Sequence, residues 1–348
     1  MKASIYALPP TTIRQIGSSQ ALADPSSVVK ELIDNAIDAR ATSIFIEISI
    51  NSLDVIQVRD NGHGVAPEDR AMLCRRHHTS KIRNFEDLKE IGGKSLGFRG
   101  EALASVAEMS GDLRIFTRVE GEPVAVLLKI EKTGDIRDQE HVSHPVGTTV
   151  RVIDFFNSLP VRKQAALKHS SKYLANIKRL VQAYAFARPT VRFSLRILKA
   201  KNDKGNWTYA PKPGATVADA ALSIVGRECA SQCEWSVLDS NGFNIEAFLP
   251  KPDADSSKIA NLGQFLSIDS RPVSTTRGTL KAMIKTFIQK LRTSNSGSDR
   301  AKDPFMHMNI LCPPDSYDLN IEPAKDNMLF INSELVLRVV EELLSTFY

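Results

Sequence analysis

Acidic and amide side chains recur along one side of a helix that we expect over residues 25–38. These side chains are Glu31, Asp34, Asn35 and Asp38, which are three or four positions apart and therefore share one face, while the opposite face is apolar. A carboxylate can orient a water molecule, and an amide oxygen can ligate Mg2+. Glu31 and Asn35 could thus act on a metal-bound polyphosphate. The alternative is an ordinary solvated acidic face.

A second group of candidate residues ends an expected hairpin. Two strands are predicted over residues 42–50 and 53–59, and the second runs into Asp60-Asn61-Gly62-His63-Gly64. Glycine lets the backbone turn sharply and approach a ligand closely. The Asp60 carboxylate could accept a hydrogen bond from an exocyclic amine such as that of adenine. A plain Asn-Gly turn is the alternative.

A glycine-rich segment over residues 92–100 leads into a helix expected near Glu101. Free backbone N–H groups and the helix dipole make such a helix N-terminus an anion site. The spacing of a Walker A loop is absent, and no strand directly precedes the segment as a dinucleotide fingerprint requires. The density of glycine favours a mobile lid over a nucleotide.

These candidate residues need a sheet covered on one face by helices. We expect a helix over residues 67–78, strands over 113–118, 124–130 and 147–152, and a polar loop over 133–145. Residues 1–24 are expected to form an N-terminal arm. The pattern predicts an α+β sandwich for the first domain.

The following stretch, residues 151–204, is strongly basic and contains few acidic residues. It includes a helix expected over residues 172–187. A basic surface of this kind can bind the DNA phosphate backbone without reading bases. The alternative is that the cations simply form the solvent-exposed side of the helix and of the next strand. Past a boundary at residues 210–214, helices are expected over 217–226, 280–291 and 333–346, and strands over 243–249, 263–269 and 305–312.

Size and composition agree with two domains. The chain has 348 residues, of which 42% are hydrophobic and 24% charged, and its formal net charge is +5. No apolar run approaches the ~20 residues needed to span a bilayer, and the N-terminus lacks the apolar core of a signal peptide. The four cysteines have no zinc or disulfide spacing and are expected to be free thiols in a reducing compartment.

Four motifs in this order resemble the GHKL ATPases, the superfamily of gyrase B, histidine kinases and MutL. They are Val-Val-Lys-Glu31-Leu-Ile-Asp-Asn35, Asp60-Asn-Gly-His-Gly64, Gly97-Phe-Arg-Gly-Glu-Ala-Leu103 and Gly147-Thr-Thr149. The residues of these motifs are similar to those of MutL mismatch-repair proteins. Two further segments, Thr79-Ser80-Lys81 and Leu159-Pro-Val-Arg162, also resemble motifs of that family. The resemblance covers almost the whole chain and corresponds to the N-terminal half of that family. Ser18-Ser19-Gln20 is more similar to the eukaryotic PMS-type subunits than to the bacterial proteins.

The resemblance implies a role for each matching position. Glu31 would be the general base that orients the water attacking the γ-phosphate, and Asn35 would hold Mg2+. Asp60 would bind the adenine amine, with Gly64 admitting the base. Thr148 would lie behind the adenine. The remaining ATP-binding positions would form the lid, and they are Thr79, Ser80, Lys81, Gly97, Phe98, Arg99 and Gly100.

Residues 211–348 resemble the family's ribosomal-protein-S5-like transducer domain, which would follow a GHKL ATPase domain over residues 25–210. Asn320–Lys325 resembles a motif whose lysine reaches the γ-phosphate, so Lys325 is implied as a second catalytic residue. Glu322 stands where that motif usually has histidine. Arg271 resembles an arginine used for DNA contact, although it could be a turn residue after a strand. The implied DNA surface consists of Arg271, Arg162, Lys163, Lys178 and Arg179.

The resemblance implies a Mg-dependent ATPase that acts as a slow ATP-driven clamp in DNA mismatch repair in the nucleus. It would bind double- and single-stranded DNA, a second MutL-family subunit in a heterodimer, and MutS-type mismatch-recognition proteins. The alternative is a non-hydrolysing, ATP-gated scaffold subunit in mismatch repair or meiotic recombination. No endonuclease activity is assigned to these residues.

Overall fold

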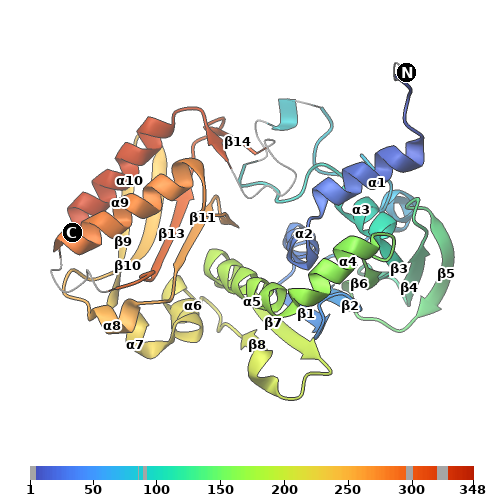
Figure 1. Ribbon diagram of the computed structural model, residues 1–348, viewed down its shortest axis with the longest axis horizontal. Helices are drawn as coiled ribbons and strands as arrows, with labels where there is room; N and C mark the ends of the chain where they lie inside the picture. The colour runs from blue at the N-terminus through green and yellow to red at the C-terminus, as the bar shows by residue number, and fades with distance from the viewer. Residues whose placement is uncertain (1–4, 85, 89–91, 295–300, 320–327) are drawn as a thin grey trace. The chain divides into compact units, whose positions relative to one another are not determined.

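The computed structural model describes residues 5–84, 86–88, 92–294, 301–319 and 328–348. The chain divides into two compact units (Figure 1). Unit 1 consists of residues 1–83, 97–178 and 193–208, and unit 2 of residues 84–96, 179–192 and 209–348. Each unit contains its own sheet. The Lys325 expected from the sequence lies outside the described residues, as does the rest of its motif.

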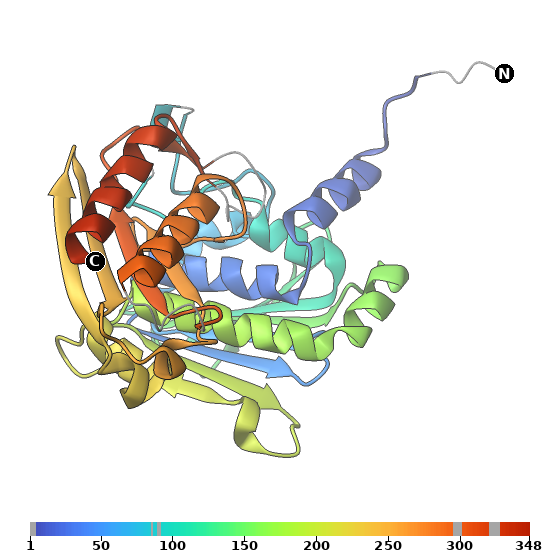
Figure 2. The ribbon, with the colours of Figure 1, turned by 60° about the vertical axis from the view of Figure 1, so that its left-hand side comes forward.

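Within the described residues, unit 1 is built on an eight-stranded sheet of order β5-β4-β3-β6-β2-β1-β7-β8. Helices α2 and α3 pack on its central strands (Figure 2). The strands are β1 (Ser43–Ser49), β2 (Val55–Asp60), β3 (Ser110–Arg118), β4 (Ala125–Ile130), β5 (Ile136–Val142), β6 (Gly147–Phe155), β7 (Arg192–Leu198) and β8 (Trp207–Tyr209). The helices are α1 (Pro10–Ala21), α2 (Pro25–Asp38), α3 (Ala102–Met109) and α4 (Pro160–Lys168), with short 3-10 turns η1 (Pro67–Met72) and η3 (Asp203–Gly205). Helix α5 (Ser170–Ala187) has residues in both units, and the 3-10 turn η2 (Glu86–Leu88) belongs to unit 2.

The expected β1–β2 hairpin is confirmed, with Ile46 opposite Val58. Alternate residues of β1 are buried, as a sheet with one helix-covered face requires. The expected loop over residues 133–145 is wrong, because β5 pairs there with β4. Strand β5 lies at the sheet edge and all its residues are at least partly exposed, so it has no alternating apolar pattern that could have revealed it.

The N-terminal arm expected over residues 1–24 contains a helix that was not anticipated, because residues 10–21 form α1, which packs on α3. Its Ser18 is fully buried and accepts a hydrogen bond of 2.6 Å from Arg76. The helix expected over residues 67–78 ends after one 3-10 segment at Met72, and turns follow, with His77 in a positive-φ conformation that a helix does not admit.

Unit 2 contains a five-stranded sheet of order β12-β11-β13-β10-β9 and a small β14-β15 pair. Helices α9 and α10 pack on each other, and α10 also packs on β9 and β10. The strands are β9 (Cys233–Ser240), β10 (Phe243–Pro250), β11 (Gln264–Ile268), β12 (Arg271–Pro272), β13 (Met306–Leu311), β14 (Tyr317–Asp318) and β15 (Leu329–Phe330). The helices are α6 (Val217–Ile224), α7 (Gly226–Ala230), α8 (Ser256–Ile259), α9 (Gly278–Ser294) and α10 (Ser333–Phe347).

The expected helices and strands of the second domain are confirmed, but β9 was not anticipated. Its outward residues include Trp235 and Val237, which are exposed, so the strand lacks an amphipathic pattern. No helix in the described part of the chain combines the length and apolarity required to cross a bilayer.

A histidine lies in the core of unit 2. His307 on β13 is 1% exposed, and its ring stacks on Phe186 with centroids 5.0 Å apart. Burial lowers the pKa of His307 to about 3, because a charged imidazolium would lose its hydration there. Among the described residues, no group hydrogen-bonds to its Nδ1. The core therefore contains a neutral imidazole that resists protonation.

Stability should consequently fall in mild acid. The folded pKa of His307 is below the unfolded value near 6.5, so the unfolded state takes up a proton first as the pH falls. We expect the unfolding free energy to drop by about 2 kcal/mol between pH 7.5 and pH 5 from this group alone. His307→Phe should remove that component in denaturant titrations, while the matched exposed substitution His169→Phe should leave it. An unchanged pH dependence in His307→Phe would contradict the assignment.

Candidate functional site

Helix α2 begins at a well-formed N-cap. The Ser27 N–H donates to Asp24 Oδ1 at 2.9 Å, the Asp24 N–H donates to Ser27 Oγ at 3.2 Å, and Pro25 is the first helical residue. The apolar face of α2 is buried, as expected. Its polar side is buried too: Glu31 is 9% exposed and Asp34 is fully buried. The solvated-face alternative is thereby excluded, because these carboxylates do not point into water.

Buried carboxylates need compensating partners, and α2 obtains them from two lysines. Lys30 lies 3.5 Å from Asp34, one turn along the helix. Lys81 forms a close ion pair with Asp38. The Lys81 ammonium also lies 3.4 Å from the Asn35 amide oxygen, the atom expected to hold Mg2+. The structure therefore gathers a carboxylate, an amide and a cation at the last two turns of α2.

The glycine-rich motif reaches the same end of α2. The Gly97 N–H donates to Asp38 Oδ2 at 2.9 Å, so Asp38 binds both lid segments expected from the sequence. Phe98 is 2% exposed, and the Arg99 guanidinium lies 5.6 Å from its ring centroid. Thr79 accepts a hydrogen bond of 3.2 Å from the Lys81 N–H, whereas Ser80 is exposed. Asp38 was not predicted as a site residue, although its place in the acidic stripe was the available signal.

Asp60 ends β2 on the helix-covered side of the sheet and is 8% exposed. One of its oxygens, Oδ1, accepts hydrogen bonds from the Gly62 N–H at 2.8 Å and the Thr148 N–H at 3.3 Å. Burial raises the pKa of Asp60 to about 6, although both hydrogen bonds oppose the shift. Within the described ranges, Oδ2 has no hydrogen-bond partner. A fixed carboxylate with one uncommitted oxygen is suited to accept from an exocyclic amine.

The turn after Asp60 is fitted between α2 and β3. The His63 N–H donates to the Ala39 carbonyl at 3.0 Å, which places the turn at the C-terminal end of α2. Gly64 has φ +75°, and a Cβ there would lie 2.2 Å from the Arg118 carbonyl oxygen. Only glycine fits this close approach. The plain-turn alternative does not explain that tight fit.

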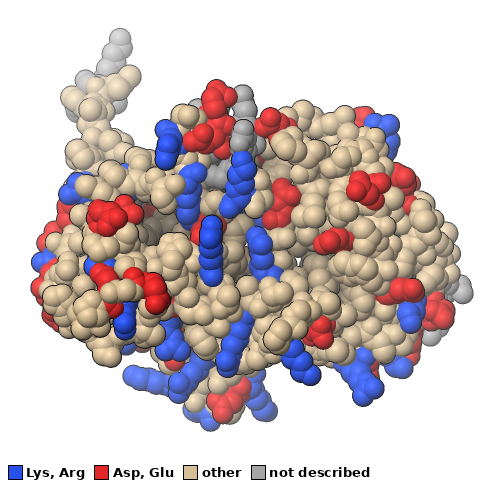
Figure 3. Space-filling view, turned by 180° about the vertical axis from the view of Figure 1, so that it is seen from behind, with Lys and Arg blue, Asp and Glu red and all other residues tan. Residues whose placement is uncertain are grey.

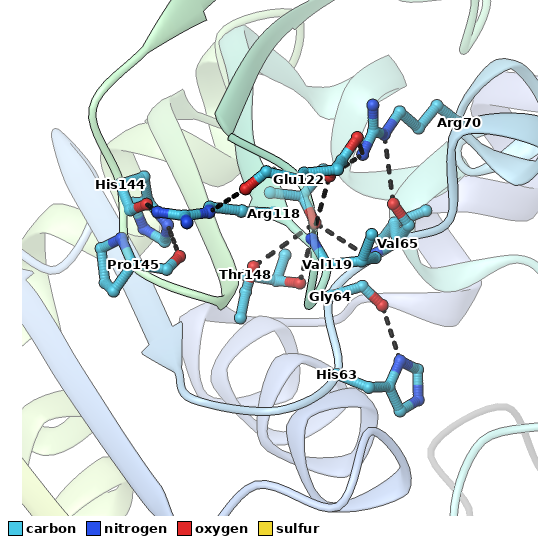
Figure 4. A network of polar contacts seen from close by, with 12 residues as sticks. His63, Gly64, Val65, Arg70, Arg118, Val119, Glu122, His144, Pro145 and Thr148 are labelled. Atoms are coloured by element: carbon cyan, nitrogen blue, oxygen red, sulfur yellow. Dashed lines mark hydrogen bonds and ion pairs between the residues drawn. The ribbon is translucent and has the colours of Figure 1, made fainter. Parts of the chain in front are cut away.

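Two threonines and an ion pair fix the neighbouring strand ends (Figure 4). Thr117, fully buried, accepts a hydrogen bond of 2.8 Å from the Val65 N–H, and its hydroxyl lies 3.4 Å from that of Thr148. Arg70 donates to both oxygens of Glu122 at 2.7 and 2.8 Å, and this guanidinium holds the pKa of the Glu122 carboxyl below its usual range. Thr117 and Arg70 were missed because only their tertiary contacts distinguish them from ordinary strand and turn residues.

The expected residues of unit 1 thus gather at one end of α2. Asn35, Lys81 and Gly97 meet there, and Asp60, Gly64 and Thr148 form a second group on the adjoining turn. Glu31 lies one helical turn before Asn35. Because the stripe is anionic, a polyphosphate could bind beside it only with cations between them, such as Lys81 and a divalent metal. Where the chain is described, no cluster of three or more His, Cys, Asp or Glu residues forms a metal cage of its own.

The residues expected to contact DNA differ in their surroundings. Arg271 is 3% exposed, and Arg179 donates to the carbonyls of Leu262 and Gln264 at 2.7 and 2.9 Å. Both guanidinium groups bind main-chain carbonyls, but the Arg271 side chain is buried whereas that of Arg179 is partly exposed. Contact of these two arginines with DNA stays a prediction. Arg162 is exposed and donates to the Ser19 carbonyl, Lys163 pairs with Asp154, and Lys178 is half-buried.

The fold and the site define the first domain as a GHKL-type ATPase domain. Residues 23–156 match the family model described as histidine kinase-, DNA gyrase B- and HSP90-like ATPase. Residues 221–348 match the model described as DNA mismatch repair protein, C-terminal domain. The order of these two matches is the one that the sequence motifs predict.

The chain is similar over nearly its whole length to mismatch-repair proteins. It is 32% identical over 337 residues to DNA mismatch repair protein PMS1 of Arabidopsis thaliana, covering 97% of this chain and 35% of that protein. It is 30% identical over 346 residues to DNA mismatch repair protein MutL of Methanothrix thermoacetophila, covering 97% and 57%. A solved N-terminal domain of a DNA repair protein superposes with a TM-score of 0.78 at 25% identity, covering 97% of both chains. The chain belongs to the MutL family of DNA mismatch repair proteins, and it spans about a third to a little over half of those two full-length relatives.

The buried Asp60 should destabilise the fold at neutral pH. Its folded pKa, about 6, is above the unfolded 3.8, so ionisation opposes folding and the unfolding free energy falls as the pH rises through 6. Asp60→Asn keeps an acceptor for Gly62 and Thr148 without the charge. We expect this variant to be more stable than wild type by up to about 3 kcal/mol at pH 8, with the difference shrinking toward pH 4. Chemical denaturation at both pH values measures it, and a pH-independent difference would contradict the burial argument.

Proposed function

We propose that this chain binds ATP with Mg2+ and hydrolyses it slowly, as an ATP-driven switch in DNA mismatch repair. The observation that carries the proposal is the buried acidic side of α2, on which the lid segments and the Asp60 turn converge. An acidic stripe buried beside glycine-rich loops has no evident structural purpose, since apolar residues would pack more stably. A bound Mg2+ would add a cation between these carboxylates and the phosphates of a nucleotide.

The adenine end of the nucleotide is assigned to Asp60. Its free oxygen, Oδ2, would accept the exocyclic amine, while Gly62 and Thr148 hold the other oxygen. Thr148 would lie behind the base, and Gly64, whose backbone packs closely against the Arg118 carbonyl, would admit the base. Such a site favours adenine because a buried acceptor left unpaired by another base costs free energy.

The phosphate end is assigned to the last turns of α2. Asn35 would hold Mg2+, which when bound would neutralise phosphate charge. Lys81, close to Asn35, would move its ammonium onto the phosphates together with the N–H groups of the Gly97–Gly100 lid. Glu31 would orient a water molecule for in-line attack on the γ-phosphate and accept its proton. Lys325 stays a prediction for transition-state charge stabilisation.

The hydrolytic role of Glu31 is tested by Glu31→Ala. This variant should bind ATP within about threefold of wild type, yet lose hydrolysis by about 100-fold or more, because only the water-orienting base is removed. Equilibrium binding and steady-state phosphate release measure the two quantities. Glu47→Ala, on the other face of the sheet, is the matched control and should behave as wild type. If wild type binds ATP but shows no turnover, the chain is an ATP-gated scaffold or requires its partner subunit.

The metal role of Asn35 is tested separately. Asn35→Ala should abolish detectable Mg-ATP binding, since it removes the amide ligand beside the acidic stripe. Isothermal calorimetry with and without Mg2+ makes the comparison, and circular dichroism checks the fold. Tight Mg-ATP binding by Asn35→Ala would overturn the metal assignment.

The switch would act through association with a second subunit. Apolar side chains near the N-terminus are exposed, and they belong to Ile5, Tyr6, Leu8, Ile13 and Ile16. A contiguous apolar segment of this kind favours a protein partner. We assign this partner to another MutL-family subunit in a heterodimer of PMS type, acting in the nucleus with MutS-type proteins. ATP would order the lid and the N-terminal segment, and hydrolysis would release them.

Non-specific DNA binding is proposed from the charge distribution. Figure 3 shows lysine and arginine side chains, with acidic side chains among them, on the side that faces away from the viewer in Figure 1. Exposed cations of the basic stretch include Arg162, Lys168, Lys172, Arg192, Lys199, Lys201 and Lys204. Such a surface binds phosphates of double- or single-stranded DNA without base readout.

The DNA proposal predicts a steep salt dependence. Reversing Arg162, Lys163 or Lys178 to Glu should weaken binding to a labelled duplex at low salt, and each lost phosphate contact should reduce the slope of log K against log salt by about 0.9. Fluorescence anisotropy from 25 to 200 mM salt measures this. Arg75→Glu, which reverses a cation paired with Asp135, is the control. Salt-independent binding, or equal losses in the control, would contradict the assignment.

A further inference from the structure

The segment just before the glycine-rich motif is bound by Arg271. Residues 84–96 belong to unit 2, although Gly97 begins unit 1 again. Arg271 on β12 donates from Nη2 to the Leu96 carbonyl at 2.7 Å and to the Ser95 carbonyl at 3.2 Å. A guanidinium is suited to this task because its planar fork donates in fixed directions and stays charged. The side chain is 3% exposed, so these hydrogen bonds are shielded from water.

Arg271 follows a turn that hydrogen bonds hold in place. Asp269 and Ser270, which join β11 to β12, have φ of +49° and +60°. Asp269 accepts the Cys312 N–H at 2.8 Å, and the Ser270 N–H donates to the Asn309 side chain at 3.0 Å. The turn is thus fastened to β13 and the residues that follow it. A guanidinium anchored in this way can hold a neighbouring segment in one place.

Gly92 gives the same segment a second contact in unit 2. The Tyr317 hydroxyl donates to Asp269 Oδ2, and a Cβ on Gly92 would lie 2.7 Å from that hydroxyl oxygen. At a separation under 3 Å one of the two groups must shift, either the Tyr317 side chain or the backbone at Gly92. The backbone at Gly92 therefore rests against the Tyr317–Asp269 pair, and any side chain there would force that shift.

The next residue along the chain is bound within unit 1. Leu96 is held by Arg271, whereas the Gly97 N–H donates to Asp38 on α2. One peptide bond therefore separates a contact in unit 2 from a contact at the candidate nucleotide site. Release of Leu96 from Arg271 would therefore free the residue directly before Gly97.

We propose that Arg271 is a positioning residue for the nucleotide lid, which holds residues 95–96 so that Gly97 is presented to the phosphates. Gly92 and Tyr317 serve the same purpose through packing. The inference rests on the proposed function, because it assumes that the lid meets a nucleotide. It replaces the expected role of Arg271 in contacting DNA, which a guanidinium occupied by main-chain carbonyls does not serve.

The first test measures how firmly the segment is held. Lys94 is exposed and lies directly before Ser95, so trypsin cleavage after Lys94 reports release of the segment. Without nucleotide, Arg271→Gln should be cut there at least fivefold faster than wild type, and Arg271→Lys at an intermediate rate. Mass spectrometry identifies the cut. The matched control is Arg179→Gln, which also removes a guanidinium from two main-chain carbonyls of unit 2 but leaves the lid contacts intact.

The second test separates positioning from a general loss of structure. Since a released lid must be reordered by the nucleotide, the ATP dissociation constant of Arg271→Gln should rise about tenfold. Turnover at saturating ATP should change less than threefold, because bound ATP restores the lid. Duplex DNA affinity at low salt should stay within twofold of wild type. A large loss of DNA affinity with unchanged cleavage at Lys94 would identify Arg271 as a DNA contact instead.

A third test leaves Arg271 untouched. Gly92→Ala should accelerate cleavage at Lys94 at least fivefold, because its new methyl group meets the Tyr317 hydroxyl. The same substitution in a Tyr317→Phe background, which removes that oxygen, should accelerate it less. Equal acceleration in both backgrounds would contradict the packing part of the proposal.

The outcomes distinguish this inference from the proposed function. If wild type binds no nucleotide, the proposed function fails, while the cleavage rates still report whether Arg271 holds the segment. If wild type binds ATP but Arg271→Gln is cut after Lys94 no faster than Arg179→Gln, the positioning role of Arg271 is wrong and the proposed function stands.

Discussion

The burial of charged side chains on α2 is the constraint on which the rest of the ATPase domain depends. A helix in which Lys30, Glu31 and Asp34 are each under 10% exposed cannot leave its carboxylates unpaired. Replacing such groups with apolar residues would generally stabilise a core, so their presence indicates a function that requires charge. The lysine partners and the glycine-rich loops around α2 follow from that requirement. Each brings a cation or a backbone N–H group to the acidic side.

Asp38 shows how this constraint connects distant parts of the sequence. It binds Lys81 and the Gly97 N–H, so one carboxylate contacts both segments that the sequence predicts as parts of a lid. The adjoining residue, Leu96, is held by Arg271. A charge introduced at this place by a nucleotide would compete for Lys81 and thereby act on both segments. Under the proposed function, phosphate binding and the position of the predicted lid would therefore be linked through ion pairs and hydrogen bonds.

Local sequence patterns predicted the helices, strands and turns whose formation depends on residues close together in the chain. The apolar face and N-cap of α2, the β1–β2 hairpin, α3, α5 and the central strand of unit 2 were all foreseen, because periodicity and turn residues specify them. Helix α1 was missed because its contacts with Arg76 and α3 are tertiary. Strand β5 was missed because both its faces are exposed to solvent. The motifs predicted that Asn35, Lys81 and Asp60 belong to one site. The binding of Arg179 and Arg271 to main-chain carbonyls was not predictable, because the sequence does not show which groups lie near a basic side chain in the folded chain.

The most direct test of the central claim compares ATP with GTP at equilibrium. In both cases calorimetry in the presence of Mg2+ measures binding to the wild-type chain. If Asp60 Oδ2 accepts an exocyclic amine at a buried site beside α2, ATP should bind and GTP, which presents a carbonyl oxygen there, should bind at least about 100-fold more weakly. Equal affinities for the two nucleotides, or no binding of either, would contradict the assignment of this end of α2 as an adenine-nucleotide site.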